Sequence, residues 1–295
     1  MMKCSIGVIV YNEEANIAKL LNALQKQKMH KVEIAEIIVV SSACKDKTDE
    51  IVTSFSACDE RIKLISEAER RGKSAAINRF IAAADSPYLI IESGDTIPAE
   101  ETVEQMITAL ADENVGMSGG RPLPENSEKN FIGYCVNLLW RLHHQMALIS
   151  PKLGEMVAFR NIVPAIPEES AVDEASIEAS ITEQGYKKVY LPDAIVHNKG
   201  PENISDFIMQ RRRIEAGHLW LIEQNNYQVI SQDKKVLLKL GWQELCSNPT
   251  RIFYLIGAVA LEIYSRILGK IDYKYKKINP YKWDIAISTK KLKHK

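Results

Sequence analysis

Apolar residues near the start of the chain follow first a strand-like and then a helix-like period. A continuous apolar run at 5–10 predicts a strand, and the polar residues 11–14 end it. The next apolar positions recur at the i, i+3, i+4, i+7 spacing of a helix, at Ile17, Leu20, Leu21 and Leu24. This first segment therefore predicts a strand, a polar loop and an amphipathic helix.

The same order of elements returns along the first third of the chain. Further strands are expected at 36–40, 62–65 and 88–91, with helices between them. Thr48 is expected to be the N-cap of the next helix, because its hydroxyl can accept a hydrogen bond from a free backbone amide. Repeated strand–helix–strand units predict a Rossmann-like α/β domain with a mostly parallel central sheet. Ligands bind beyond the carboxyl ends of such strands, so the loops that end these strands should share one crevice.

The second half of the chain has a less regular pattern. Helices are expected at 131–149 and 205–224, with a strand near 156–159 between them. Another helix should begin at the acidic pair Asp173 and Glu174. The α/β domain is therefore expected to span 1–230, followed by a helical, basic C-terminal extension at 231–295.

The C-terminal extension combines an apolar helical stripe with a basic end. Spanning a bilayer takes about 20 apolar residues, and the run at 252–268 is shorter and contains Glu262, which favours an amphipathic interfacial helix. The stretch 270–295 carries nine lysines interleaved with aromatic residues, which suits an anionic membrane surface. A tail helix packed on the domain is the alternative reading. The core shows no basic face that would favour nucleic acid.

Composition and motifs exclude several classes of protein. The chain has 295 residues, 46% of them hydrophobic, so it can bury a sizeable core. Its five cysteines are scattered, which predicts neither a disulfide framework nor a zinc site, and the N-terminus lacks a signal-peptide pattern. A cytoplasmic protein, peripheral at the cytoplasmic face of the membrane, is expected. Because Glu67 stands where a phosphate loop ending in Gly72-Lys73-Ser74 needs glycine, an ATPase is disfavoured.

The chain contains an ordered set of short motifs, namely VIVYNEEANI, IIVVSSACKDKTDEIV, RRGKSAAINR, IIESGDTIP, GEMVAFR, VDEASIEASITEQGY, LPDAIVHNKGP and QRRRIEAGH. In order and spacing, these motifs resemble the family 2 glycosyltransferases of the GT-A fold, within the nucleotide-diphospho-sugar transferase superfamily. The resemblance covers roughly residues 3–220. The resemblance implies that residues 1–120 form a nucleotide-sugar half and 121–230 an acceptor half.

The resemblance also implies a site for a UDP- or GDP-sugar. By position in the motifs, the base and ribose would contact Tyr11, Glu13, Asp46, Arg71 and Lys73. Ser41 and Ser42 stand where the family usually has paired aspartates, so the identity of the base stays open.

A divalent ion, Mg²⁺ or Mn²⁺, is the implied cofactor. The Asp-x-Asp motif of the family aligns with Ser93-Gly94-Asp95, which leaves Asp95 as the expected ligand and Ser93 for the ribose or a water. Glu92 should point to the opposite face of an extended backbone. His197 stands where the family often has a histidine near the diphosphate, so it would ligate the ion or donate to a phosphate oxygen. The alternatives are a turn aspartate at Asp95 and a structural histidine at His197.

Catalytic roles follow from the same resemblance. Asp173-Glu174 matches the acidic pair of the family, with Glu174 as the base that takes a proton from the acceptor, although acids at a helix start also complement its dipole. Gly154 and Glu155 would line the acceptor side. Gln210-Arg211-Arg212-Arg213 resembles a Gln-x-x-Arg-Trp signature in which Ile214 replaces tryptophan. Of these, Gln210, Arg211 and Arg213 are expected to bind the departing diphosphate.

The expected activity is inverting, metal-dependent, hexosyltransferase-like transfer from a nucleotide sugar. The acceptor would be a saccharide or a polyprenyl-linked molecule in cell-envelope, polysaccharide or glycoconjugate synthesis. A catalytically degenerate, membrane-associated scaffold is one alternative, because several motif positions depart from the family. A sugar-nucleotide pyrophosphorylase is less favoured, because a glycine-rich phosphate loop after the first strand is absent.

Overall fold

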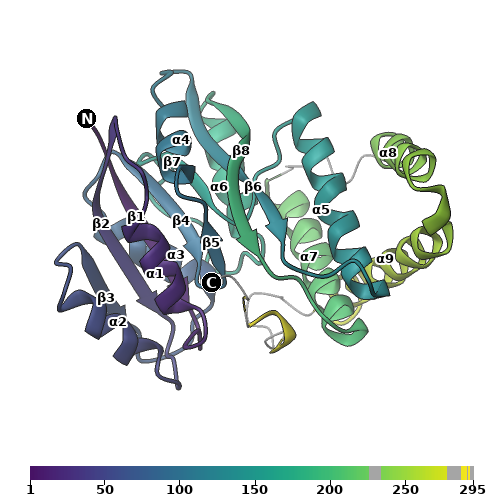
Figure 1. Ribbon diagram of the computed structural model, residues 1–295, viewed down its shortest axis with the longest axis horizontal. Helices are drawn as coiled ribbons and strands as arrows, with labels where there is room; N and C mark the ends of the chain where they lie inside the picture. The colour runs from purple at the N-terminus through teal and green to yellow at the C-terminus, as the bar shows by residue number, and fades with distance from the viewer. Residues whose placement is uncertain (226–233, 278–286, 291, 293–295) are drawn as a thin grey trace.

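The computed structural model describes residues 1–225, 234–277, 287–290 and 292. Strands and helices alternate in the first half of the chain, and helices dominate the end (Figure 1). The strands are β1 Met2–Val10, β2 Val32–Ser41, β3 Ile62–Ser66, β4 Tyr88–Ser93, β5 Thr96–Pro98, β6 Val115–Pro124, β7 Val157–Arg160 and β8 Lys187–Asn198. The helices are α1 Ile17–Gln25, α2 Thr48–Ser56, α3 Lys73–Ala83, α4 Thr102–Ala109, α5 Phe131–Ile149, α6 Asp173–Glu183, α7 Ile204–Asn225, α8 Lys234–Ser247 and α9 Ile252–Lys274.

The eight strands form one sheet in the order β3-β2-β1-β4-β7-β6-β8-β5. Strands β3, β2, β1 and β4 run parallel to one another, as does β6 with β8. Strand β7 is antiparallel to both of its neighbours, and β5 is antiparallel to β8. Because β1 lies between β2 and β4, the loops that follow these three strands meet at one edge of the sheet.

Helices cover both faces of the sheet. On one face, α1, α2 and α4 bury residues such as Leu20 against Ile6 and its neighbours. On the other face, α3, α5 and α6 pack around Phe80 and Ile9. Successive β1 residues point to opposite faces, so this fully buried strand serves both cores. A Cβ at Gly7 would lie 2.4 Å from the Phe80 ring, so glycine allows α3 to approach the sheet closely.

A further layer of helices, α5, α7 and α9, stands beside the sheet (Figure 1). Phe207 of α7 is buried against α5 and α9. Two ion pairs also join α7 to α9, with Arg211 binding Glu262 through 2.7 and 2.8 Å contacts and Arg212 binding Asp272 at 2.5 Å. Guanidinium–carboxylate forks are directional, so they fix the angle at which α9 crosses α7.

One helix in the described residues, 249–274, is long and apolar enough to cross a membrane by length and composition. Only 17% of its most apolar window is buried inside the protein. Glu262, the acid that the sequence analysis weighed against a span, is neutralised by Arg211 and Arg266. The helix is therefore largely exposed, with Glu262, Arg266 and Asp272 turned towards α7.

The structure confirms the predicted α/β class and mostly parallel sheet, and each helix and strand expected from the sequence is present within a few residues. The N-cap prediction is wrong, because Lys47 precedes the helix and Thr48 is its first residue. Strands β5, β6 and β8 and helices α4 and α8 were not predicted. The boundary expected at 230 lies outside the described residues, and the division at that point stays a prediction.

Candidate active site

One cavity opens at the carboxyl ends of β1, β2 and β4 and continues between α5, α7, α8 and α9. Its volume is about 1430 Å³. The three loops that the sequence predicted to converge all contribute to its wall, together with the start of α6. The residues that line this end include Tyr11, Glu13, Ser42, Ser93, Asp95, Asp173 and Glu174.

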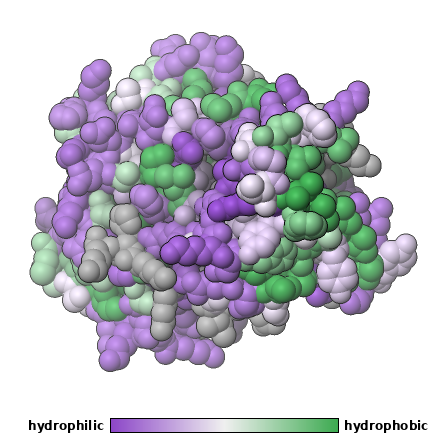
Figure 2. Space-filling view, turned by 45° about the vertical axis from the view of Figure 1, so that its right-hand side comes forward, coloured by the Kyte–Doolittle hydropathy of each residue, from purple (hydrophilic) through white to green (hydrophobic). Residues whose placement is uncertain are grey.

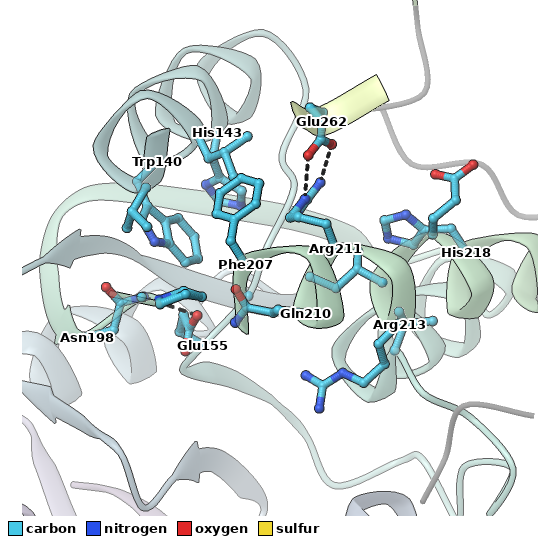
Figure 3. A pocket seen from close by; sticks show the side chains of 18 of the residues that line it. Trp140, His143, Glu155, Asn198, Phe207, Gln210, Arg211, Arg213, His218 and Glu262 are labelled. Atoms are coloured by element: carbon cyan, nitrogen blue, oxygen red, sulfur yellow. Dashed lines mark hydrogen bonds and ion pairs between the residues drawn. The ribbon is translucent and has the colours of Figure 1, made fainter. Parts of the chain in front are cut away.

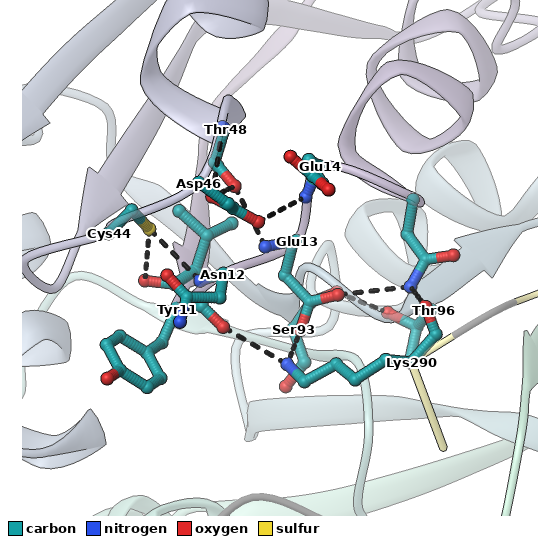
Figure 4. A network of polar contacts seen from close by, with 12 residues as sticks. Tyr11, Asn12, Glu13, Glu14, Cys44, Asp46, Thr48, Ser93, Thr96 and Lys290 are labelled. Carbon is teal, nitrogen blue, oxygen red and sulfur yellow. Dashed lines mark hydrogen bonds and ion pairs between the residues drawn. The ribbon is translucent and has the colours of Figure 1, made fainter. Parts of the chain in front are cut away.

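Hydrogen bonds lock the loops after β1 and β2 together (Figure 4). The Asp46 carboxylate accepts the backbone N–H groups of Glu14 at 3.0 Å and Thr48 at 3.1 Å. Thr48 Oγ1 in turn accepts the N–H of Glu13 at 2.8 Å. Burial opposes ionisation of Asp46, but the bonds from Thr48 and Glu14 outweigh it and lower its pKa. Asp46 is absent from the described cavity lining, so the structure places it as a loop brace.

Tyr11 lies at the cavity wall with Arg70 above its ring. The Arg70 guanidinium is 4.2 Å from the ring centroid, a cation–π distance. Arg71, the residue chosen from the sequence, instead forms an ion pair with Glu168 at 2.8 Å and is not among the described lining residues. Arg70 rather than Arg71 therefore reaches the cavity.

A residue from the C-terminal segment reaches the same loops. Lys290 Nζ forms an ion pair with Glu13 and donates a hydrogen bond to the Tyr11 carbonyl at 3.2 Å (Figure 4). Asn16 holds this segment from both sides, because its Nδ2 donates to the Lys290 carbonyl and its Oδ1 accepts from the Leu292 N–H. Burial and the nearby Asp95 raise the pKa of Glu13 to about 7, against the opposing effect of Lys290.

The Ser93-Gly94-Asp95 loop presents one carboxylate to the cavity. Asp95 lines the cavity, whereas Glu92 is fully buried behind it and accepts a hydrogen bond from Thr96 Oγ1 at 3.0 Å. The sequence prediction that Glu92 points away from Asp95 agrees with this placement. Burial raises the pKa of Glu92 well above its usual range. A Cβ at Gly94 would lie 2.8 Å from Glu13 Cγ, so glycine lets the loops touch.

The start of α6 places both predicted catalytic acids in the wall, bridged by a lysine. Lys73 Nζ lies 2.7 Å from Asp173 Oδ2 and 2.9 Å from Glu174 Oε1. Burial and Asp173 raise the pKa of Glu174, although Lys73 opposes the change. Ser74 Oγ also donates to the Ser170 carbonyl at 2.8 Å, which ties the start of α3 to the loop before α6. Lys73 therefore contacts the acids and positions them.

Gly154 and Glu155, which the sequence predicted for the acceptor side, line the cavity beside Asn198. Asn198 Nδ2 donates to Glu155 Oε1 at 3.1 Å, and burial with the nearby Asp95 raises the pKa of Glu155 to about 7 (Figure 3). A Cβ at Gly154 would meet nothing within 4 Å, so the space beside it is open. His197, expected from the sequence beside the metal ion, is not in the described lining, because strand alternation turns Asn198 inward and His197 to the opposite face.

In the Gln210–Arg213 segment of α7, one arginine is held in an ion pair and another is available to the cavity. Arg211 binds Glu262, whereas Arg213 points away from that pair (Figure 3). Gln210, Arg211 and Arg213 all line the cavity. An exposed guanidinium at Arg213 can bind phosphate oxygens in two-point contact.

Three lining residues were missed by the sequence analysis. Arg70 and Asn198 each neighbour a residue that was chosen, and for Asn198 the strand period could have separated it from His197. Lys290 carries no local signal, because its place depends on the fold bringing the chain end back to β1. Among the described residues, no group of three or more His, Cys, Asp or Glu is arranged to hold a metal ion by itself.

The fold is of the GT-A type. The chain belongs to glycosyl transferase family 2, whose family model matches residues 5–164. A mannosyltransferase, PcManGT from Pyrobaculum calidifontis, was solved in complex with GDP-Man and Mn²⁺. The fold of the present chain superposes on it with a TM-score of 0.66 at 20% identity, covering 93% of this chain and 88% of that one.

Two curated relatives extend the comparison. The chain is 32% identical over 116 residues to glycosyltransferase AglE of Haloferax volcanii, covering 39% of this chain and 38% of the relative. It is 24% identical over 236 residues to the probable glycosyltransferase YdaM of Bacillus subtilis, covering 75% of this chain and 56% of the relative. The chain therefore spans about half or less of these relatives' lengths.

Proposed function

We propose that the protein transfers a sugar, with inversion, from a nucleotide-diphosphate donor to a saccharide or lipid-linked acceptor. The observation that carries the proposal is the convergence of Tyr11, Asp95 and Glu174 on one cavity from three separate parts of the chain. Solved structures of similar fold support the donor class, since PcManGT holds GDP-Man and a Mycobacterium tuberculosis glucosyl-3-phosphoglycerate synthase holds UDP-glucose.

In this proposal, the donor half of the cavity binds the nucleotide and the diphosphate. Tyr11 offers an aromatic face to the base, and Arg70, whose guanidinium lies over the Tyr11 ring, can close over the opposite face of the base. Gln210 lines the same cavity, and in this proposal its amide donates to the leaving diphosphate as that group gains charge. Contacts from Glu13, Asp46, Arg71 and Ser93 to the donor stay predictions.

The acceptor loses its proton to Glu174 as its oxygen attacks the anomeric carbon. Lys73 holds this carboxylate at 2.9 Å and keeps it oriented beside Asp173. Glu155, hydrogen-bonded to Asn198, presents a second oxygen surface to acceptor hydroxyls. The acceptor oxygen displaces the nucleoside diphosphate from that carbon in one step, which gives a β-linked product from an α-linked donor.

A divalent ion, Mg²⁺ or Mn²⁺, fits the oxygen-rich wall at Asp95. A single carboxylate suits an ion that completes its shell with waters and donor diphosphate oxygens, and the described residues offer no self-sufficient metal cluster. Asp95 would hold the ion, and Ser93 would bind a coordinated water or the ribose. When bound, the ion neutralises charge on the leaving diphosphate. PcManGT was solved with Mn²⁺.

A thermal-shift screen of the full chain tests the donor assignment. Because a ligand that binds only the folded state stabilises it, one family of UDP-, GDP- or dTDP-sugars should raise the melting temperature, and more so with Mn²⁺. Asp95→Asn should abolish the Mn²⁺-dependent part of the shift. Asp193→Asn, an exposed β8 position outside the described cavity lining, is the matched control.

Nucleoside-diphosphate release in the presence of acceptor tests the chemistry. Glu174→Gln should keep the donor-dependent thermal shift and lose about 100-fold or more in turnover, since it can no longer accept a proton. Full turnover in both Asp95→Asn and Glu174→Gln would show that the assigned roles are wrong. Donor binding by the unaltered chain, without any transfer, would support the scaffold alternative.

A further inference from the structure

The cavity is larger than a nucleotide sugar needs. Small-molecule sites typically occupy about 300–1,000 Å³, whereas this cavity measures about 1430 Å³. Its excess lies away from the sheet, between α5, α7, α8 and α9. We call this part the apolar groove, and it is lined by side chains such as Leu139, Met146, Leu238, Trp242, Val259 and Ile263.

Much of the apolar groove faces water in the described structure. Leu238 is 75% exposed and Trp242 is 67% exposed, while Val259 and Ile263 are about half exposed. Figure 2 shows hydrophobic side chains gathered on the side of the molecule that carries α8 and α9. A contiguous apolar surface of this kind marks a site for an apolar partner. Because the apolar groove and the predicted catalytic residues line one cavity, the partner should be a molecule that also reaches Glu174.

Cationic side chains on α7 stand between the catalytic end and the apolar groove, because α7 packs against Val172, just before α6, at Gly217 and against α9 at Gly269. Arg213 on α7 points away from the Arg211–Glu262 pair (Figure 3), and Lys152 and Arg266 also line the cavity. Burial and the neighbouring Arg211 lower the pKa of Lys152 to about 8, so an added anion there would be stabilised. The order along the cavity is therefore catalytic acid, cationic junction and apolar groove.

This order matches one molecule: a reacting group, an anionic phosphate linker and a long aliphatic chain. We propose that the apolar groove binds the chain of a lipid-phosphate-linked acceptor, with its phosphate at Arg213 and its reacting end at Glu174. The inference rests on the proposed glycosyl transfer and specifies its acceptor. A docking protein helix would cover the groove from outside without placing a reacting group inside the cavity.

Binding of simple amphiphiles tests the groove without knowledge of the acceptor sugar. The full chain is titrated with dodecyl phosphate below its micelle concentration, with butyl phosphate, and with dodecyltrimethylammonium, while tryptophan fluorescence is followed. Dodecyl phosphate has eight more methylenes than butyl phosphate, and each fully buried methylene strengthens binding about fourfold. Even if only about half of them are buried, dodecyl phosphate should bind at least ~100-fold more tightly than butyl phosphate. The cationic amphiphile should bind at least tenfold more weakly than dodecyl phosphate.

Charged substitutions separate the groove from a general apolar surface. Val259→Glu and Leu238→Glu should each weaken dodecyl phosphate binding at least tenfold. Arg213→Gln should weaken the binding of dodecyl phosphate but leave the binding of dodecanol unchanged. Phe253→Glu is the matched control, because Phe253 is 83% exposed on the same helix and absent from the described cavity lining. The nucleotide-sugar thermal shift is recorded for every variant to show that it is folded.

Each outcome decides a separate question. Equal binding of all amphiphiles, or equal loss in Phe253→Glu and Val259→Glu, would overturn the groove and leave glycosyl transfer standing. A concentration-dependent dimer that Val259→Glu abolishes would show that a second copy covers the groove, which also overturns the proposal. If no nucleotide sugar shifts the melting temperature but dodecyl phosphate binds tightly, the proposed glycosyl transfer is wrong, and the acceptor assignment that depends on it also fails.

Discussion

Lys73 sets the charge state of the acid pair at the start of α6. Its ammonium lies within 2.9 Å of both carboxylates and opposes the rise in the pKa of Glu174 that burial and Asp173 cause. A base must be ionised, so the rate falls as pH decreases through the raised pKa of Glu174, above the usual range of a glutamate. Lys73→Met should raise that pKa further and move the acid limb of the kcat/KM profile to higher pH.

Lys73→Arg is the control, because it keeps the positive charge beside the acids. Its acid limb should stay within a few tenths of a pH unit of the unaltered protein. An acid limb that does not move in Lys73→Met would mean that Glu174 is not the titrating base.

At the same scale, sequence reasoning identified the right loops more reliably than the right side chains. Tyr11, Asp95, Glu155 and Glu174 line the cavity as predicted, because each lies within two residues of the start or end of a predicted strand or helix. Arg71 and His197 do not appear in the described lining, and for His197 the reason is that a one-residue step along a strand reverses the direction of the side chain.

Among the elements, the described C-terminal residues 287–290 and 292 are docked across α1 mainly by polar contacts. Lys290 binds buried Glu13, whose pKa is about 7, and removing the cation should raise that pKa. An acid whose pKa is raised on folding adds to the free energy of unfolding at pH values below its unfolded-state pKa. This contribution is lost as the pH rises through its folded-state pKa. Lys290→Met should therefore cost about 1–3 kcal/mol of unfolding free energy at pH 8.5 and little at pH 5.

Urea unfolding in EDTA at the two pH values measures this difference without a metal ion at Asp95. Glu13→Gln combined with Lys290→Met should recover most of the loss, because the buried group is then neutral. An equal loss at both pH values would indicate that packing of the segment, rather than the charge pair, carries the stability.

Two strands that were not predicted, β6 and β8, share a physical reason. Strand β6 contains Gly116, Gly119 and Gly120, and β8 contains Pro192 beside the charged Asp193, so neither has an apolar alternation. The glycines of β6 allow close approach, since a Cβ at Gly120 would lie 2.4 Å from the Ala194 carbonyl. Such tertiary requirements leave no periodic signal, unlike the strongly apolar β1, β2 and β4.

At the scale of the whole molecule, α9 and the lysines that follow it suggest a membrane-facing side. Phe253 is 83% exposed, and Lys270, Lys274 and Lys276 are exposed beyond the apolar part of the helix. We expect the full chain to bind vesicles that contain anionic lipid more strongly than zwitterionic ones. Raising the salt from 0.1 to 1 M shortens the Debye length from about 10 to about 3 Å, so binding should weaken.

Co-sedimentation of the protein with vesicles measures this binding. Phe253→Glu should lower the bound fraction several-fold, because it places a charge where an aromatic ring would enter the interface. Leu148→Glu, at an exposed apolar position on α5, should bind like the unaltered chain. If Phe253→Glu binds as well as Leu148→Glu at every salt concentration, α9 is not the contact. Since Phe253 lies outside the described groove lining, loss of vesicle binding in Phe253→Glu with dodecyl phosphate affinity retained would separate attachment from acceptor binding.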